Sequence, residues 1–515
     1  MFLKDEIIKH YPLLVQEHQK SQNLNKDAFA KQIELKRLNY DSDFREKLKQ
    51  VLLEQYTSIN KSKKVSKNIE SLANKDTFTV CTGHQLCLFG GPAYVAYKIL
   101  QTIKLASELS KQQNLQVVPV LWLANEDHDF EEISFLRIYK QGIKWNGAYT
   151  DQSVGNLKSN ELKPLIHAFE QLLGVSSKAK SFINHLRFCL ESSDDLTDFY
   201  RRFFNCLFGE YGLIVLDASD KKLKQLFEPI FNKELNTSFL YKAVNKEIQK
   251  WEGSYKAQVN PRECHLFHLK NGKRKRIDKI DGNFFVVQEN KDLKAIKIEE
   301  LTSINLSPNV LMRPIYQEYI LPNIAYVGGT AEISYWLELK QAFIEIELPF
   351  PKLIARNSVF FINKKTQTLC NSNNLEIASF FNGKAKILTK YAKQHSDTIM
   401  AFEDLQLELN QSLKNLHKLS ESKEEGTKRS LKADITKIEN ILHHMESKII
   451  KSAKKENIQV LNQIETAFDK VFPEGKWQER MQHYLSFELQ MEDCYLNKVY
   501  LGIRPLENGA LLINQ

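Results

Sequence analysis

A strand, glycine turn, helix and strand between residues 76 and 135 constrain the fold of this chain more than any other feature. Residues 78–80 are typical of a short strand, and the turn over residues 83–92 leads into a helix that we expect from Tyr94 to Leu109. Val117 to Leu123 is a continuous apolar run of strand length, as found in strands buried on both faces. This βαβ pattern predicts a parallel sheet in an α/β fold.

The turn between the first strand and the helix is rich in glycine, and it predicts an anion site. A glycine turn at a helix N-terminus directs free backbone N–H groups and the positive end of the helix dipole toward one point, which suits a phosphate. Pro92 fits the first helical position, because its missing N–H costs nothing there. The candidate donors at this turn are Gly83, His84, Gln85, Gly90 and Gly91.

A dense polar cluster follows the second strand. Residues 126–132 contain five carboxylates and one histidine, just past the carboxyl end of the strand, where open α/β sheets bind their ligands. A solvated helix start, in which the dipole favours acidic residues, is the alternative. We favour a site because the glycine turn lies one βα unit earlier. Its candidate residues are Asn125, Glu126, Asp127, His128 and Asp129.

Length and composition narrow the class of protein. A chain of 515 residues is too long to fold around a single hydrophobic core, so two or three domains are expected. The net charge of +9 is modest, and alternating Lys and Glu indicate solvated faces, so no nucleic-acid partner is expected. The dense basic run Lys273–Arg276 follows Asn271-Gly272, which predicts a β-hairpin with an exposed charged face; a phosphate or acidic-substrate contact is the minority interpretation.

The cysteines and the apolar runs indicate where the protein works. Seven scattered cysteines without a CxxC pair favour free thiols in a reducing cytoplasm, and no zinc is expected. The first residues lack the basic start and apolar core of a signal peptide. No apolar run approaches the ~20 residues of a membrane helix, so we expect a cytoplasmic protein.

Composition shifts divide the chain into four parts. Residues 1–75 form a polar helical segment, and residues 76–380 follow an α/β pattern that carries a β insert. Within 76–380 we expect further strands at Gly212–Asp220, Ile324–Val327, Glu345–Leu348 and Leu353–Ala355, and a second glycine turn, Gly328-Gly329, that opens a helix.

The last two parts are a helical coiled coil, at 385–470, and a segment at 471–515 that packs back on the core. The coiled coil has a seam of apolar residues that step by four and three, typical of a and d positions: Leu431, Ile435, Ile438, Leu442, Met445 and Ile449. The polar turn Ser420–Thr427 separates it from a preceding helix with a looser stripe, which predicts an antiparallel coiled-coil hairpin.

Together these motifs resemble a known family. Thr82-Gly-His-Gln, Leu88-Phe-Gly-Gly-Pro92, Glu126-Asp-His-Asp129, Arg313-Pro with Gln317-Glu318, and Gly328-Gly329 with Glu332 and Tyr335-Trp336 occur in that order, followed by the coiled coil. This set is similar to the bacillithiol biosynthesis cysteine-adding enzymes, or cysteine ligases. The resemblance implies that residues 76–380 form a core like that of class I aminoacyl-tRNA synthetases, with a Rossmann-like sheet and an inserted α+β connecting region at about 136–300. It also implies a coiled coil that forms a homodimer.

The resemblance also implies an activity, the addition of L-cysteine to the amine of glucosaminyl-malate in the final step of bacillithiol synthesis. ATP would activate the cysteine carboxylate as a cysteinyl-adenylate, so ATP or ADP is the expected nucleotide, with Mg²⁺ as a further candidate. The catalytic candidates are His84, Gln85, Asp127, His128 and Asp129, and the nucleotide candidates are Gly83, Gly90, Gly91, Gly328 and Gly329. The candidate substrate ligands are Asn125, Glu126, Arg313, Gln317, Glu318, Glu332, Tyr335 and Trp336.

Several alternatives stay open at the level of sequence. Arg313 would suit the malate carboxylates, or it would pair with Glu318; Tyr335 and Trp336 would be ligands or core residues. The histidine turn lacks the second histidine of the synthetase His-Ile-Gly-His signature, and no Lys-Met-Ser-Lys-Ser-like loop follows the core. An RNA-linked synthetase paralogue and a non-catalytic coiled-coil scaffold are the rival functions. The sequence leaves open whether ATP is cleaved to AMP or to ADP, and whether the nucleotide binds at the histidine turn or nearer the coiled coil. It also leaves open which residue is the general base and whether a second protein supplies the activation.

Overall fold

A computed structural model describes residues 1–515 with the exception of residues 148 and 422. The chain forms two compact units, one of residues 1–360 and 479–513 and the other of residues 361–478 and 514–515. It passes from the first unit to the second within strand β14 (Ser358–Ile362).

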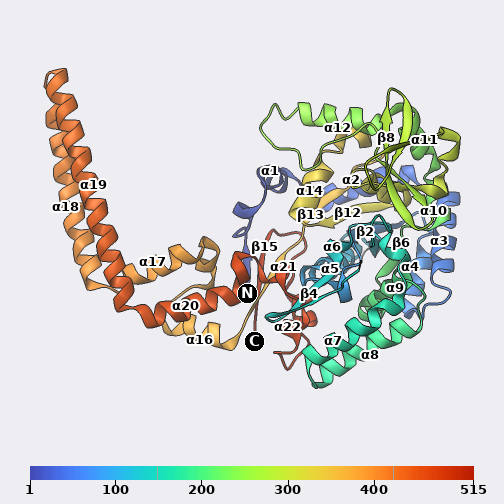
Figure 1. Ribbon diagram of the computed structural model, residues 1–515, viewed down its shortest axis with the longest axis horizontal. Helices are drawn as coiled ribbons and strands as arrows, with labels where there is room; N and C mark the ends of the chain where they lie inside the picture. Colours follow the sequence, from blue (N-terminus) through green and yellow to red (C-terminus); the bar gives the residue numbers. More distant parts are fainter. Residues whose placement is uncertain (148, 422) are drawn as a thin grey trace. The chain divides into compact units, whose positions relative to one another are not determined.

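The first unit is built around a parallel sheet of five strands, in the order β13–β12–β2–β3–β6 (Figure 1). The strands are β2 (Thr77–His84), β3 (Gln116–Leu123), β6 (Ile214–Asp217), β12 (Asn323–Gly328) and β13 (Lys352–Ala355). The chain builds outward from β2 through β3 to β6, and then returns to the other side of β2 to add β12 and β13. The strand order therefore reverses between β2 and β12, which is the place where doubly wound sheets bind ligands.

The apolar residues of these strands form the core expected from the sequence. Phe78 and Val80 of β2 pack with Val117 of β3 and Ile324 of β12, all of them buried. Helix α5 (Tyr94–Gln113) covers β2 and β3, and α2 (Lys26–Asn39) covers β12. We predicted Pro92 as the first residue of this helix. That prediction is wrong, because Ala93 is the N-cap of α5 and Pro92 precedes it.

The register of the sheet aligns the carboxyl ends of its strands. His84 at the end of β2 lies opposite Leu123 of β3, which lies opposite Asp217 of β6. Gly328 at the end of β12 lies opposite Ala355 of β13. The glycine turns and the acidic cluster that follow these strands consequently start from one edge of the sheet.

The helices at the N-terminus are α1 (Leu13–Ser21), α2, α3 (Ser42–Gln55) and α4 (Lys63–Ser71), preceded by strand β1 (Phe2–Lys4). Lys64 and Lys67 lie in α4. Ser62 begins this helix, since its hydroxyl accepts a hydrogen bond from the N–H of Val65.

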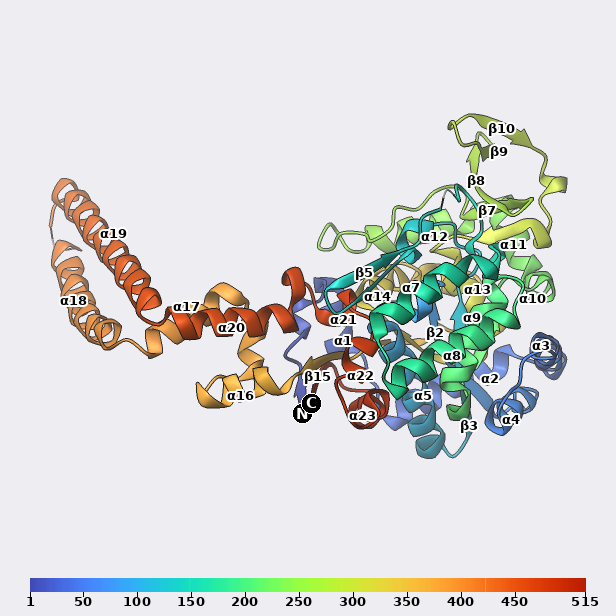
Figure 2. The ribbon, with the colours of Figure 1, turned by 60° about the horizontal axis from the view of Figure 1, so that its bottom comes forward.

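The region between β3 and β12 contains two insertions, because β6 between them belongs to the central sheet. The first consists of α6 (Phe130–Ile133), the hairpin of β4 (Phe135–Ile138) and β5 (Gln141–Lys144), and helices α7 (Lys163–Leu173), α8 (Ser177–Glu191) and α9 (Leu196–Phe208). The second consists of α10 (Lys221–Leu226), α11 (Glu228–Thr237), α12 (Phe239–Gln249) and an antiparallel sheet (Figure 2). That sheet contains β7 (Leu266–Lys270), β8 (Lys273–Ile280), β9 (Asn283–Val287), β10 (Leu293–Ile296) and β11 (Leu306–Pro308).

The local predictions in this region and beyond are mostly confirmed. Asn271 and Gly272 form the turn of the β7–β8 hairpin, and Asp220 caps α10. Gly329 caps α14 (Thr330–Leu337) after α13 (Met312–Ile320) and β12. The strand predicted at Glu345–Leu348 is wrong: α15 (Lys340–Glu345) ends there, and the Leu348 N–H donates to the Phe343 carbonyl to close the helix end.

The second unit is helical, with α16 (Lys364–Ser372), α17 (Lys384–Gln394), α18 (Asp397–Glu421), α19 (Glu425–Glu456) and α20 (Ile458–Val471). Helices α18 and α19 run side by side in opposite directions, as the predicted hairpin requires (Figures 1 and 2). The helices resume at Glu425, so the connection is shorter than the predicted polar turn, and Ser422 within it lies outside the described residues. Within the described residues, no helix has the length and apolar character needed to cross a membrane.

Part of the C-terminal segment belongs to the first unit. It contains α21 (Gln478–Met481), α22 (Leu485–Glu488), α23 (Tyr495–Gly502) and β15 (Gly509–Asn514), which pairs antiparallel with β1. His483 contacts the Phe89 carbonyl through Nε2 at 3.1 Å, and the Tyr495 and Tyr97 hydroxyls are 2.7 Å apart. These contacts join the segment to the glycine turn and to α5.

Candidate functional site

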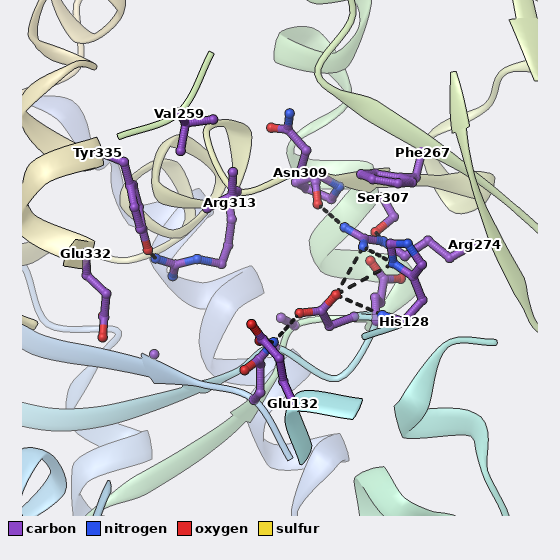
Figure 3. A pocket seen from close by; sticks show the side chains of 18 of the residues that line it. His128, Glu132, Val259, Phe267, Arg274, Ser307, Asn309, Arg313, Glu332 and Tyr335 are labelled. Carbon is purple, nitrogen blue, oxygen red and sulfur yellow. Dashed lines mark hydrogen bonds and ion pairs between the residues drawn. The ribbon is translucent and has the colours of Figure 1, made fainter. Parts of the chain in front are cut away.

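A cavity of about 1180 Å³ opens at the carboxyl ends of β2, β3 and β12. Its wall is completed by the antiparallel sheet of the second insertion and by the segment 258–264 that precedes it. Figure 3 shows Tyr335, Arg313 and Glu332 on one side of this cavity and Phe267, Arg274 and His128 on the other. The two sides differ in chemistry, and each is built from elements that are far apart in the sequence.

His84 lines the cavity at the end of β2 as a neutral imidazole. Its Nδ1 lies 3.1 Å from the Gln85 carbonyl, which can only accept, so Nδ1 carries the proton. Its Nε2, 3.2 Å from the Tyr94 hydroxyl, therefore accepts a hydrogen bond. Burial, and then the nearby Lys98 ammonium, lower the pKa of His84 to about 4. Burial also raises the pKa of Tyr94, so this hydroxyl keeps the proton that it donates.

Beside His84, a buried lysine and a glutamate form an ion pair. The Lys98 Nζ lies 2.6 Å from both carboxylate oxygens of Glu332 and donates to the Gly83 carbonyl at 2.7 Å. The Tyr326 hydroxyl donates to the same carboxylate at 2.5 Å. Burial alone would raise the pKa of Glu332, but Lys98 and Tyr326 outweigh it and lower the value. Glu332 is therefore held ionised at the start of α14.

Arg313 is a half-buried cation whose hydrogen bonds go to neutral groups. Its guanidinium donates to Gln317 Oε1 at 3.1 Å and to the Tyr335 hydroxyl at 3.0 Å. It does not pair with Glu318, because that carboxylate forms a fully buried ion pair with Lys36 of α2 at 2.8 Å. Gly83 leaves room for it, since a Cβ there would lie 2.9 Å from Arg313 Nη1. A guanidinium held in this way retains its capacity to bind an anion.

The opposite side of the cavity holds two carboxylates bridged by an amide. Gln85 Nε2 donates to Asp127 at 2.6 Å and to Glu132 at 2.7 Å. The backbone N–H of His128 also donates to Asp127, at 2.8 Å. Burial alone would raise the pKa of Asp127, but the hydrogen bonds from His128 and Gln85 and the charge of Arg274 hold it below its usual range. Asp127 is therefore a carboxylate at any pH near neutrality.

Arg274 of β8 connects the insertion to this acidic side. Its Nη1 donates to His128 Nδ1 at 2.8 Å and lies 3.4 Å from Asp127 Oδ1. Its other nitrogens donate to the Ser307 hydroxyl at 2.9 Å and to the Pro308 carbonyl at 2.7 Å. Because Nδ1 of His128 accepts from a guanidinium, the imidazole presents a protonated Nε2. The guanidinium stacks 3.9 Å above the ring of Phe267.

Asn125 and Glu126 line the floor of the cavity and are tied to its frame. The Asn125 amide donates to Asp217 at 2.6 Å and so joins the ends of β3 and β6. Glu126 is paired with the buried ammonium of Lys224. Both side chains therefore fix the geometry of the strand ends.

Other predicted residues lie outside the set of described residues that line the cavity: Asp129, Gly90, Gly91, Gly328, Gln317, Glu318 and Trp336. Asp129 caps α6, and the N–H groups of Gly90 and Gly91 donate to the carbonyls of Cys87 and Leu88. Those two N–H groups are consequently used within the turn rather than directed at a ligand. Gln317, Glu318 and Trp336 are buried, with Trp336 stacked 4.4 Å from Tyr326.

The sequence reasoning did not single out several residues that line or support the cavity: Lys98, Glu132, Arg274, Ser307, Arg356 and Arg480. Glu132 was visible in the acidic cluster and Arg274 in the basic run, whose minority interpretation was an anion contact. Arg356 pairs with Glu479 at 2.7 Å and lies over the Tyr94 ring. Desolvation and then the charge of Arg356 lower the pKa of Arg480. A bound anion would reduce the repulsion between these two guanidinium groups.

The arginines of this cavity have the chemistry of an anion site. Within the described part of the chain, no three His, Cys, Asp or Glu side chains gather as metal ligands would. By contrast, Arg313, Arg356 and Arg480 offer three guanidinium groups to one cavity at the reversal point of the sheet. Guanidinium groups match the geometry of phosphate and carboxylate oxygens.

Comparison with known proteins gives a consistent result over the whole chain. The family described as "Bacillithiol biosynthesis BshC, N-terminal Rossmann-like domain" matches residues 5–357, and "Bacillithiol biosynthesis BshC, C-terminal coiled-coil domain" matches residues 359–514. Proteins named "Putative cysteine ligase BshC" from Christiangramia forsetii and Flavobacterium johnsoniae are each 34% identical, over 95% of this chain and 92% of their own. One of that name from Staphylococcus saprophyticus is 28% identical over 68% of each chain.

Among solved structures, a putative arginyl-tRNA synthetase from Campylobacter jejuni aligns with 89% of this chain and 95% of its own, at 9% identity and a TM-score of 0.23. The family assignment rests on the sequence matches alone. Since both domains match in order, and relatives 34% identical cover 95% of the residues, the chain belongs to the BshC family of bacillithiol biosynthesis.

Proposed function

We propose that this protein is a cysteine ligase that adds L-cysteine to the amine of glucosaminyl-malate, the final step of bacillithiol synthesis, with ATP as the activating nucleotide. One observation carries this proposal: a single cavity holds the Arg313 guanidinium, which is hydrogen-bonded to neutral groups, on one side and two amide-bridged carboxylates on the other. The proposed substrates bring the matching charges, namely carboxylates, phosphates and an ammonium group.

The basic side of the cavity would bind the anionic groups. We assign a carboxylate of the malate to Arg313, because its fork suits bidentate pairing and Tyr335 and Gln317 already hold it in place. Arg356 and Arg480 would take phosphate oxygens of the nucleotide. Bound ATP would supply a leaving group for the cysteine carboxylate, which at neutral pH does not otherwise react with an amine.

The acidic side would bind the ammonium group of cysteine. Asp127 stays ionised and is fixed by Arg274 and the His128 N–H, so it offers a preorganised negative charge. Gln85 holds Glu132 beside it. Neutral His84 and its partner Tyr94 would contribute hydrogen-bonding groups between the two sides without adding a charge.

Product formation tests this proposal. Purified protein is incubated with cysteine, glucosaminyl-malate and ATP, and bacillithiol is measured by mass spectrometry together with AMP and ADP. We expect product only when ATP is present, and the nucleotide product identifies the bond that is cleaved. Arg313→Ala and Asp127→Asn should each reduce kcat/KM by roughly 10- to 100-fold, the loss of one charge-assisted hydrogen bond.

Arg187→Ala is the matched control, because Arg187 is an exposed residue of α8 paired with Glu170 outside the cavity. Its activity should equal that of the wild type. Product formation that is unchanged by Arg313→Ala and Asp127→Asn would contradict the site assignment. No product from the wild-type protein under any condition would contradict the proposed activity of this chain alone, and salt-dependent RNA binding would then favour an RNA-linked role.

A further inference from the structure

Two cysteines of the first insertion face each other across helices α8 and α9. The sulfur atoms of Cys189 and Cys206 are 4.0 Å apart. Cys189 is buried, whereas Cys206 is exposed. Among the other cysteines, Cys494 is exposed, and four are buried: Cys81, Cys87, Cys264 and Cys370.

The surroundings of the pair favour the thiolate form of one cysteine and the thiol form of the other. The hydrogen bond from Cys189, and then the charge of Arg202, lower the pKa of Cys206 to about 7 against the opposing effect of desolvation. The same hydrogen bond, together with burial, raises the pKa of Cys189. Arg202 lies one helical turn before Cys206 and is held by Asp198 at 2.9 Å. The reactive form of a cysteine is the thiolate, and here it would be on the exposed residue.

We propose that Cys189 and Cys206 form an oxidation site, in which a peroxide converts the two thiols into a reversible intramolecular disulfide. The Cys206 thiolate attacks one oxygen of the peroxide, the O–O bond breaks, and a sulfenic acid forms while hydroxide leaves and takes up a proton. The Cys189 sulfur then attacks the Cys206 sulfur, the S–O bond breaks and water leaves. For hydrogen peroxide, two thiols lose two electrons and two protons, and the peroxide becomes two water molecules.

The geometry suits this second step. A disulfide needs sulfur atoms about 2.05 Å apart, so the two must approach by about 2 Å. The oxidised pair would link α9 covalently to α8. Helix α9 also supports the cavity, since Tyr200 accepts a hydrogen bond from the Phe89 N–H and Thr197 accepts one from Asn125.

Peptide mapping of the full-length protein tests the proposal. The protein is treated with hydrogen peroxide, the remaining thiols are alkylated, and a proteolytic digest is analysed by mass spectrometry. We expect a cross-linked Cys189–Cys206 peptide that dithiothreitol removes. Cys206→Ser should abolish the cross-link, Cys189→Ser should leave a sulfenic acid at Cys206 that dimedone traps, and Cys494→Ser, the exposed-thiol control, should change nothing.

A second measurement does not depend on oxidation. The rate of Cys206 alkylation by iodoacetamide should rise with pH around a midpoint of about 7, and the midpoint should move upward in Cys189→Ala, which removes the hydrogen-bond donor. Circular dichroism of each variant confirms that it is folded. A sulfenic acid at Cys206 without a cross-link in the wild type, or reaction of Cys494 while Cys206 stays reduced, would overturn the proposal.

Discussion

At the scale of single residues, the cavity depends on protonation states that neighbouring groups fix. His84 is the clearest case, because its two ring nitrogens have different partners, the Gln85 carbonyl and the Tyr94 hydroxyl. With its pKa lowered to about 4, we expect the imidazole to stay neutral above about pH 5. Nitrogen chemical shifts of histidine-labelled protein would check this. A resonance of His84, assigned with His84→Gln, that titrates between pH 6 and 7 would contradict it.

The same shift has a consequence for stability. Below about pH 6.5 an unfolded chain protonates this histidine, whereas the folded protein does so only near pH 4. The contribution of His84 is therefore fully present above the unfolded pKa and is lost as the pH falls toward about 4. Acid unfolding of His84→Gln should begin at a lower pH than that of the wild type.

A second residue-scale prediction concerns Gly83. A methyl group at this position would come within 2.9 Å of Arg313 Nη1, the mobile end of a side chain, and 3.6 Å from the Trp122 carbonyl. Gly83→Ala should therefore displace the guanidinium without unfolding the protein. Under the proposed function, we expect KM for glucosaminyl-malate to rise roughly 10-fold, with little change in melting temperature. Gly426→Ala, which meets no atom within 4 Å, is the matched control, and equal KM values in both variants would refute the assignment of Arg313.

At the scale of elements, the segment before β7 is held against α14 by one carboxylate. Glu338 accepts hydrogen bonds from the N–H groups of Gln258 and Val259, at 2.6 and 3.3 Å, and those two residues line the cavity. Its second oxygen is buried without a hydrogen-bond partner among the described residues. Burial raises the pKa of Glu338 to about 7 despite the two N–H groups.

This raised pKa predicts a pH-dependent stability. The folded protein keeps the proton that an unfolded chain releases near pH 4.5, so this contribution is present below that pH and is lost as the pH rises through about 7. The free energy of unfolding of the wild type should therefore fall as the pH rises from about 4.5 to about 7. Glu338→Gln should make this fall smaller, by no more than about 3 kcal/mol. Denaturant unfolding at several pH values measures it. Glu345→Gln, at a residue 44% exposed, is the control, and a wild-type slope in Glu338→Gln would contradict the prediction.

Local elements could be predicted from the sequence, whereas the partners of side chains often could not. The β2 turn, the β3 strand and the β7–β8 hairpin follow from glycine positions and apolar runs, which act over a few residues. Arg274 reaches Asp127 only because the insertion folds back over the central sheet, 147 residues away in the chain. Glu318 meets Lys36 across 282 residues. No short-range pattern contains such contacts.

At the scale of the whole molecule, the strand order explains why the site lies where it does. The parallel sheet and the coiled-coil helices could be predicted from periodicity, but the order β13–β12–β2–β3–β6 could not, because it is decided by which strand pairs with which. The reversal between β2 and β12 brings Gly83 and Gly329, which lie far apart in the sequence, to one cavity. It also makes β6, expected inside an insertion, a strand of the core.

The helical hairpin of the second unit leads to a prediction about assembly. Several large apolar side chains on α18 and α19 are exposed, among them Leu405 at 62%, Leu416 at 49% and Ile438 at 37%. Exposed apolar stripes of this kind are typical of surfaces that associate. We propose that a second copy of this chain covers these side chains, because apolar residues at steps of three and four suit helix pairing.

Light scattering of the purified protein should therefore give twice the mass of the chain. Leu405→Lys with Leu416→Lys should give a monomer, since each lysine would place a charge in an apolar contact. Asn410→Lys with Gln411→Lys adds the same charge at exposed polar positions of α18 and should remain a dimer. A monomeric wild type, or equal masses for the two double variants, would show that these leucines do not mediate self-association.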